Sequence, residues 1–152
     1  MVNTEIYEYI LSRIQSTLSD YGYSRSGKAA LFYRYAADRK VGCCIEMQKS
    51  MLNSPERYSF TFNLLCVSLY DLDDYFNDRL TVSTMKYYLN SNLSERIGHL
   101  TRGHDYWWEI TDEVLKEFTL EEYYDTFLMG EIKASASHLA DLSAKKENRY
   151  SE

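Results

Sequence analysis

The chain has 152 residues, of which 45% are hydrophobic and 15% aromatic, and its formal net charge is -6. This length and hydrophobic content predict one folded domain that buries roughly 70% of the surface its unfolded chain would expose, and they exclude wholesale disorder. The negative charge argues against a general nucleic-acid binder, which needs a basic surface to replace the counterions around phosphates.

The cysteines and the N-terminus indicate a cellular location. The cysteines form no Cys-x-x-Cys pair and no Cys/His spacing typical of zinc, so we expect reduced thiols, no metal and no cofactor. The N-terminus lacks the basic and apolar regions of a secretion signal, and no stretch approaches the roughly 20 apolar residues of a membrane span. These patterns predict a cytoplasmic protein that does not bind a membrane. The cysteines are Cys43, Cys44 and Cys66.

The first predicted element is an amphipathic helix over 4–21. Apolar residues recur in steps of four, four, four and three from Ile6 to Tyr21, which is the stripe of a helix that packs one face on a core. Asn3 or Thr4 can cap its start, and Gly22 supplies the left-handed residue that ends many helices.

Three runs with a period of two follow, over 31–36, 41–48 and 58–66. They predict an antiparallel meander with connections at 37–40 and 51–57. From Asn63 onward both faces of the third run are apolar. We therefore expect the third strand to be central and covered on both sides there.

The second half of the chain predicts a polar loop at 71–79, a short helix at 82–89 and a final helix after residue 119. Thr119 and Glu122 match a capping box. The segments 94–100 and 106–110 predict a pair of short strands around a turn at 101–104. The expected fold is a single α+β domain over 1–144, in which an antiparallel sheet, a meander plus a short strand pair, packs against N-terminal and C-terminal helices. A disordered tail is expected over 145–152.

Several short segments follow one another in an order that resembles the bacterial domain of unknown function (DUF) 4304 family. The resemblance covers roughly residues 5–130. It implies an α+β fold with antiparallel strands between flanking helices, and it brings no established activity and no catalytic residues. The matching segments are Gly22-Tyr23, Phe32-Tyr33-Arg34, Glu46-Met47-Gln48-Lys49-Ser50, Phe60-Thr61-Phe62-Asn63-Leu64, Arg96-Ile97-Gly98 and Asp105-Tyr106-Trp107-Trp108.

Polar residues in these segments have two interpretations. Gln48, Lys49 and Ser50 end the second strand, where they either satisfy the following turn or face a ligand. Asn63 lies within an apolar strand and needs hydrogen-bond partners if it is buried, because an unsatisfied amide costs roughly 1 to 3 kcal/mol. A structural role is the simpler interpretation for Gln48, Ser50 and Asn63.

The richest stretch contains an arginine, an aspartate and both tryptophans. Arg96 and Asp105 are expected to form a bidentate ion pair packed on Trp107 or Trp108, or else to line an open pocket. Since the tryptophans are adjacent, a strand would bury one and expose the other. Gly98 predicts a bulge or a close backbone approach, under one of these rings.

Enzymatic motifs are scarce. His99 and His104 lack a third ligand at a recognisable spacing, and no glycine-rich phosphate loop is present. The aspartates that follow residue 70 resemble a calcium loop only superficially, because the glycine at the sixth place is missing. Ser50 or Cys44 would act as a nucleophile only with a histidine nearby in space.

These patterns favour a binding protein, and small acidic bacterial proteins of such families are often immunity proteins that neutralise a toxin, an analogy at the level of families. We expect the partner to be a protein with a basic surface. An alternative is a small enzyme or ligand sensor with a pocket near Gln48, Arg96, Asp105 and Trp108, and a third is a structural subunit. The expected partner surface is Tyr70, Asp71, Asp73, Asp74, Tyr75 and Asp78.

Overall fold

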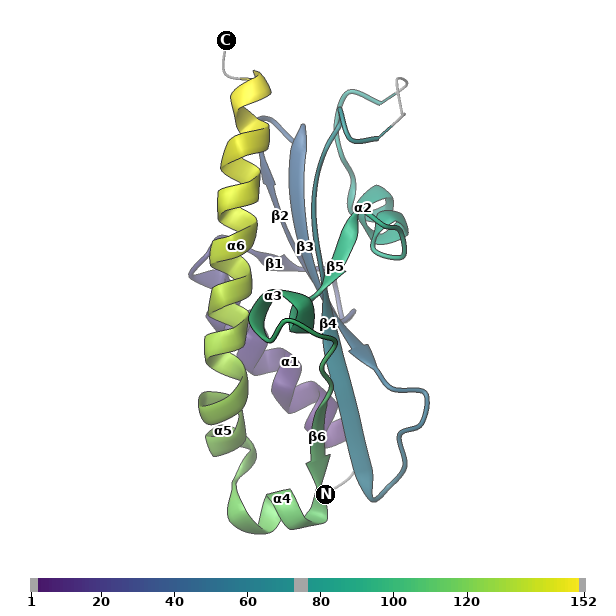
Figure 1. Cartoon of the computed structure of the whole chain (residues 1–152), viewed down its shortest axis with the longest axis vertical. Coiled ribbons are helices and arrows are strands. Elements are labelled where there is room, and N and C mark those ends of the chain that lie inside the picture. Colours follow the sequence, from purple (N-terminus) through teal and green to yellow (C-terminus); the bar gives the residue numbers. More distant parts are fainter. Residues whose placement is uncertain (1–2, 73–76, 151–152) are drawn as a thin grey trace.

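A six-stranded antiparallel sheet forms the centre of the molecule in a computed structural model that describes residues 3–72 and 77–150 (Figure 1). Strands β1 to β4 follow one another across the sheet, and β5 and β6 both pair with the second edge of β4. The strands are β1 (Ser24–Arg25), β2 (Leu31–Ala36), β3 (Val41–Lys49), β4 (Arg57–Ser68), β5 (Ser94–Arg96) and β6 (Trp108–Thr111).

Helices cover both faces of this sheet, so the predicted α+β architecture is confirmed. The first helix and the long last helix lie on one face, and α2 lies on the other (Figure 1). The helical elements are α1 (Asn3–Ser19), α2 (Val82–Tyr88), α3 (Ile97–Thr101), α4 (Asp112–Glu117), α5 (Leu120–Tyr123), the π-helix η1 (Tyr124–Leu128), α6 (Met129–Glu147) and the 3-10 helix η2 (Asn148–Tyr150).

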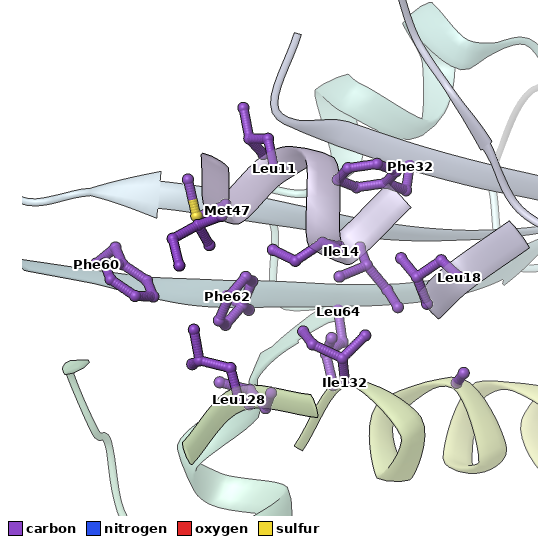
Figure 2. Close-up of a cluster of buried hydrophobic side chains, with 14 of the residues drawn as sticks. Leu11, Ile14, Leu18, Phe32, Met47, Phe60, Phe62, Leu64, Leu128 and Ile132 are labelled. Carbon is purple, nitrogen blue, oxygen red and sulfur yellow. The ribbon is translucent and has the colours of Figure 1, made fainter. Parts of the chain in front are cut away.

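The main core lies between the sheet, α1 and the start of α6 (Figure 2). The apolar stripe is buried from Ile6 to Leu18, as its period predicts, and it meets the aromatic side chains of β4, whereas α1 ends at Ser19 and Tyr21 beyond it is half-buried. Gly22 has a φ of 83° just after α1, which confirms the predicted left-handed stop. The labelled core residues are Leu11, Ile14, Leu18, Phe32, Met47, Phe60, Phe62, Leu64, Leu128 and Ile132.

Strand β4 is central and buried over almost its whole length, as the sequence predicts. Phe62 and Leu64 face α1 and α6, whereas Leu65 and Val67 face α2 in a second apolar cluster. Alternation along the strand places Asn63 on the same face as Leu65. That face is therefore apolar beneath α2 and polar toward the other end of β4.

The connection between β2 and β3 is a tight turn of left-handed residues. Ala37, Asp38 and Arg39 have φ values of 52°, 53° and 66°, which L-residues seldom adopt. The following segment holds this turn in place: the Arg39 side chain donates two hydrogen bonds to Leu80 O, and Leu80 N donates to Arg39 O at 2.7 Å.

The predicted strand pair after residue 94 is wrong in two respects. Only 94–96 is extended, because the chain then turns into the short helix α3, and β5 and β6 pair with β4 and not with one another. Gly98 allows the segment 104–106 to pass close to α3. A Cβ on Gly98 would overlap His104 O and lie 2.6 Å from Tyr106 N, so glycine lets the returning chain cross directly over α3. The predicted close approach is confirmed, although it is to backbone and not to a ring.

The C-terminal region begins with the predicted capping box. Glu122 N donates to Thr119 Oγ1, and Thr119 N donates to Glu122 Oε1, both at 3.1 Å. The helix widens into a π-helix over η1 before it continues as α6. Residues 145–147, which the sequence assigns to a disordered tail, belong to α6, and 148–150 form η2. Lys146 explains this extension, because its ammonium binds Asp71 and Cys66 O and so ties the end of α6 to the sheet.

Candidate functional site

The expected partner surface at 70–78 is partly used to hold the fold together. Tyr70 is 64% exposed and packs on Tyr150 with ring centroids 5.4 Å apart. The Asp71 carboxylate accepts from Ser68 N at 2.7 Å and from Lys146 Nζ at 2.6 Å. Although burial opposes ionisation, these hydrogen bonds lower the pKa of Asp71 below its usual value. Asp78 is exposed, and the expected site residues Asp73, Asp74 and Tyr75 lie outside the described residues.

The side chains of Glu46, Gln48 and Asn63 form a hydrogen-bonded group on one face of the sheet, whereas Lys49 contacts α1 and Ser50 lies in the turn after β3. Asn63 Nδ2 donates to Gln48 Oε1 at 2.9 Å and to Glu46 Oε1 at 3.2 Å, which confirms the structural interpretation of this asparagine. Ser50 Oγ accepts from Leu52 N at 3.1 Å and so satisfies the turn after β3. Lys49 Nζ lies 4.7 Å from the centre of the Tyr7 ring. Each of these contacts is internal to the fold.

The predicted cluster of arginine, aspartate and tryptophan is present in a looser form. Arg96 Nη1 lies 3.7 Å from Asp105 Oδ1, so the pair is a single long ion contact and not a bidentate one. The Arg96 guanidinium lies 5.3 Å from the Trp107 ring, and Trp107 Nε1 donates to Asp105 Oδ2 at 3.3 Å. Together these contacts hold the segment 105–107 beside Arg96 at the end of β5.

The two tryptophans lie on opposite sides of the chain, as alternation predicts. Trp108 is 2% exposed in the main core, whereas Trp107 is half-buried beside Arg96. Gln48 and Arg96 belong to the polar face through Asn63, and Trp108 faces the helices. The four residues expected to share a pocket are therefore divided between two faces of the sheet.

The described residues contain no group of three His, Cys, Asp or Glu side chains placed to hold a metal ion. His99 and His104 are both exposed, and His104 Nδ1 lies 2.7 Å from the neighbouring Asp105 O. None of the helices within 3–72 and 77–150 combines the length and apolar character that crossing a membrane requires.

A second concentration of negative charge lies in residues 109–131, which we call the acidic segment. It holds eight acidic residues and one lysine, a formal charge of -7, whereas the whole chain carries -6. The rest of the chain is therefore nearly neutral. This excess of acidic residues can be read from the sequence, but only when charge is summed over a longer stretch than the aspartate cluster at 71–78. The segment forms β6, α4, α5, η1 and the start of α6, at the end of the molecule opposite the C-terminus (Figure 1).

Half of these acidic side chains have internal roles. Glu109 pairs with Arg57 at 3.2 Å, Asp125 with Arg13 at 2.8 Å and Glu131 with Arg102 at 3.1 Å, and Glu122 belongs to the capping box. The other four are exposed and have no ion pair within the described residues, so their charge faces solvent. These are Asp112, Glu113, Glu117 and Glu121.

Two hollows that share Arg102 and Phe127 open beside the acidic segment. The larger, the α3–α6 hollow, has a volume of about 530 Å³ and is lined by α3, η1 and the start of α6. The smaller, the aromatic hollow, has a volume of about 330 Å³ and is lined by six aromatic side chains: Tyr106, Trp107, Trp108, Phe118, Tyr123 and Phe127.

Arg102 connects the two hollows. Its guanidinium carbon lies 3.8 Å from the centre of the Tyr106 ring and 5.6 Å from that of Trp108, and Nη2 donates to Glu131 Oε1 at 3.1 Å. Glu131 Oε2 is buried and has no hydrogen-bond partner in the described structure. Phe127 remains 38% exposed at the junction. This end therefore combines negative charge, accessible aromatic surface and an unsatisfied acceptor.

Comparison with family models finds no match for this chain, and no curated protein or solved structure is significantly similar to it. The resemblance to the DUF 4304 family stays a prediction.

Proposed function

We propose that this protein is a cytoplasmic binding protein that covers a basic surface on a protein partner, in the manner of an immunity protein bound to a bacterial toxin. One observation carries the proposal: the acidic segment holds a charge of -7 and borders two hollows, the smaller of which has aromatic walls. Its expected partner is a protein and not a nucleic acid or a membrane, because phosphate groups would be repelled by this end.

The charges and the aromatic rings have separate roles in such an interface. Exposed carboxylates at its rim speed the encounter with a basic surface, and their effect falls as salt rises. Buried anchors at its centre slow dissociation, and aromatic and arginine side chains are the commonest anchors. Phe127 supplies such a centre, because it packs on Phe118 and Tyr123 at centroid distances of 5.2 and 5.0 Å and is still partly exposed.

The geometry favours the acidic segment over the surface at 70–78. Asp71 is already neutralised by Lys146, whereas Asp112, Glu113, Glu117 and Glu121 have no ion pair among the described residues. The described residues that flank 73–76 and the acidic segment lie toward opposite ends of the long axis (Figure 1). A single partner domain therefore engages one of them, and variants in each region distinguish the two.

The toxin role is tested by co-expression. We would express the C-terminal domain of a large secreted protein encoded beside this gene, with and without this protein, and measure growth and complex formation. We expect growth arrest by the toxin alone and rescue by co-expression. Absence of both rescue and binding refutes the immunity role for that pair.

Two variants with the same loss of charge locate the interface. The first replaces Asp112, Glu113, Glu117 and Glu121 with Asn or Gln, and the second replaces Asp71, Asp73, Asp74 and Asp78 with Asn. We expect the first to lower the association rate with little change in the dissociation rate, because rim charges act on encounter. We expect a smaller change for the second. A larger fall for the second variant would move the interface to 70–78.

A further inference from the structure

The α3–α6 hollow is lined by Glu131, one of whose carboxylate oxygens has no donor in the described part of the protein. Glu131 Oε1 accepts from Arg102 Nη2, but Glu131 Oε2 is buried and unpaired. A carboxylate oxygen shielded from water is unfavourable until a donor reaches it, and a charged donor gives the strongest bond. The hollow is therefore suited to a ligand with a cationic hydrogen-bond donor.

The walls of the hollow suit a long side chain with an apolar stem. Leu100 and Phe127 provide apolar surface, and Gly130 has no side chain to narrow the site. A Cβ at Gly130 would meet no atom within 4 Å, which shows open space above the helix at this point. The volume of about 530 Å³ lies within the range that small ligands occupy.

Charge and aromatic character select arginine among such side chains. The acidic segment, to which Glu131 and Phe127 belong, carries a charge of -7. A guanidinium group stacks on aromatic faces and donates in several directions, whereas an ammonium group is more strongly hydrated. The protein itself makes a contact of this kind at the hollow, because Arg102 binds Glu131 Oε1 and lies on the Tyr106 ring.

We infer that the α3–α6 hollow receives an arginine side chain of the basic partner, whose guanidinium donates to the Glu131 carboxylate while its stem lies on Leu100 and Phe127. This inference rests on the proposed function, since it names the side chain that anchors the partner. Arg102 shares the same carboxylate with the incoming arginine. Removing Arg102 therefore frees Glu131 Oε1 for the incoming arginine, whereas removing the Glu131 charge weakens the contact itself.

The test uses a short peptide in place of the partner, so that it does not depend on finding the toxin. The peptide acetyl-Gly-Gly-Arg-Gly-Gly-amide is titrated into the labelled protein and followed by NMR, alongside the same peptide with citrulline, the uncharged isostere of arginine. We expect the arginine peptide to shift the amides of Thr101 and Gly130. The citrulline peptide should bind at least about tenfold more weakly, because it lacks the charge-assisted bond.

Three variants separate the inferred contact from general charge and from folding. Glu131→Gln should weaken the arginine peptide at least about tenfold, the loss expected for one charge-assisted bond. Glu56→Gln removes an exposed acid from the hairpin between β3 and β4 and should leave the affinity unchanged. Arg102→Gln also breaks the ion pair with Glu131, yet it should bind the peptide as well as the native protein or better. Thermal melts confirm that each variant is folded.

The outcomes are decisive in both directions. Equal binding of the arginine and citrulline peptides, unchanged binding to Glu131→Gln, or equal weakening by Arg102→Gln and Glu131→Gln would each overturn the inference. Rescue from a toxin without peptide binding would leave the proposed function standing and refute the arginine anchor. Peptide binding at Gly130 without rescue from any toxin would support the arginine site and refute the immunity role.

Discussion

Replacement of Trp108 with alanine is expected to remove a large share of the folding free energy. The ring is 2% exposed and packs on Phe60, Phe62 and Tyr106 at centroid distances of 6.4, 5.6 and 5.0 Å. Burial of about 200 Å² of ring surface at about 25 cal/mol/Å² corresponds to about 5 kcal/mol, an upper value because the unfolded chain is partly compact. Core aromatic truncations cost about 3 to 5 kcal/mol, and we expect this range here.

Trp107 is the matched control, since it is the same residue type one position away. It is half-buried and contributes a hydrogen bond to Asp105 and a contact with Arg96. Such contacts near the surface are worth about 1 kcal/mol in total, so Trp107→Ala should be much milder than Trp108→Ala.

The assay is urea unfolding followed by circular dichroism, which does not depend on tryptophan fluorescence. With a slope of about 2 kcal/mol per molar urea, Trp108→Ala should lower the midpoint by about 1.5 to 2.5 M and Trp107→Ala by about 0.5 M. Equal and small losses, under about 1 kcal/mol for both variants, would show that neither ring belongs to the core and would refute the facing of β6 described above.

Three further outcomes follow from the structure. Gly98→Ala should destabilise the protein by about 2 kcal/mol or more, because the added Cβ would overlap the backbone at His104. Gly130→Ala, where the added Cβ meets open space, should instead stabilise α6 by about 0.5 to 1 kcal/mol, and equal melting temperatures of the two variants would contradict this. Because the pKa of Asp71 is lowered in the folded protein, its ionisation adds stability that is complete above the unfolded pKa of about 3.9 and is lost as the pH falls further. The difference in unfolding midpoint between the native protein and Asp71→Asn should therefore shrink below about pH 4. A difference independent of pH would exclude the pairing with Lys146. Elemental analysis of protein purified without a histidine tag should find no stoichiometric transition metal, since the described residues hold no metal-binding cluster, and one zinc per chain would overturn this.

The sequence predicts those elements whose periodicity is strong and local. The apolar stripe of α1, the alternation of β3 and β4 and the capping box at Thr119 each depend on neighbours within a few residues, and all are present. The local pattern after Ser94 predicts the wrong element because the structure of this segment depends on distant contacts. Arg96 pairs with Asn63 across the sheet, and Gly98 lies under residues 104–106, which no local pattern records.

In the candidate site, too, features that depend on local sequence are predictable and those that depend on distant contacts are not. Asn63 was correctly predicted to need structural partners, because a buried amide within an apolar strand is a local signal. The α3–α6 hollow was not predicted, since it depends on how α3 docks beside η1 and α6. Glu131 and Arg102 are 29 positions apart, and their pairing follows from the fold alone. The acidic segment was detectable as composition, but its position beside the two hollows was not.

The pairing of β4 along both of its edges affects which backbone amides are exposed by local unfolding and which only by global unfolding. This strand pairs with β3 along one edge and with β5 and β6 along the other, so its backbone amides are held by both halves of the chain. Loss of β5 or β6 leaves β3 in place, but β4 itself is released only when the whole domain comes apart. Its amides should therefore be the last to exchange with deuterated water, at a rate set by global unfolding, while those of β6 exchange through a smaller local opening. The amides of the meander are therefore expected to be the better protected from exchange, and those of β6 at the aromatic end the less protected.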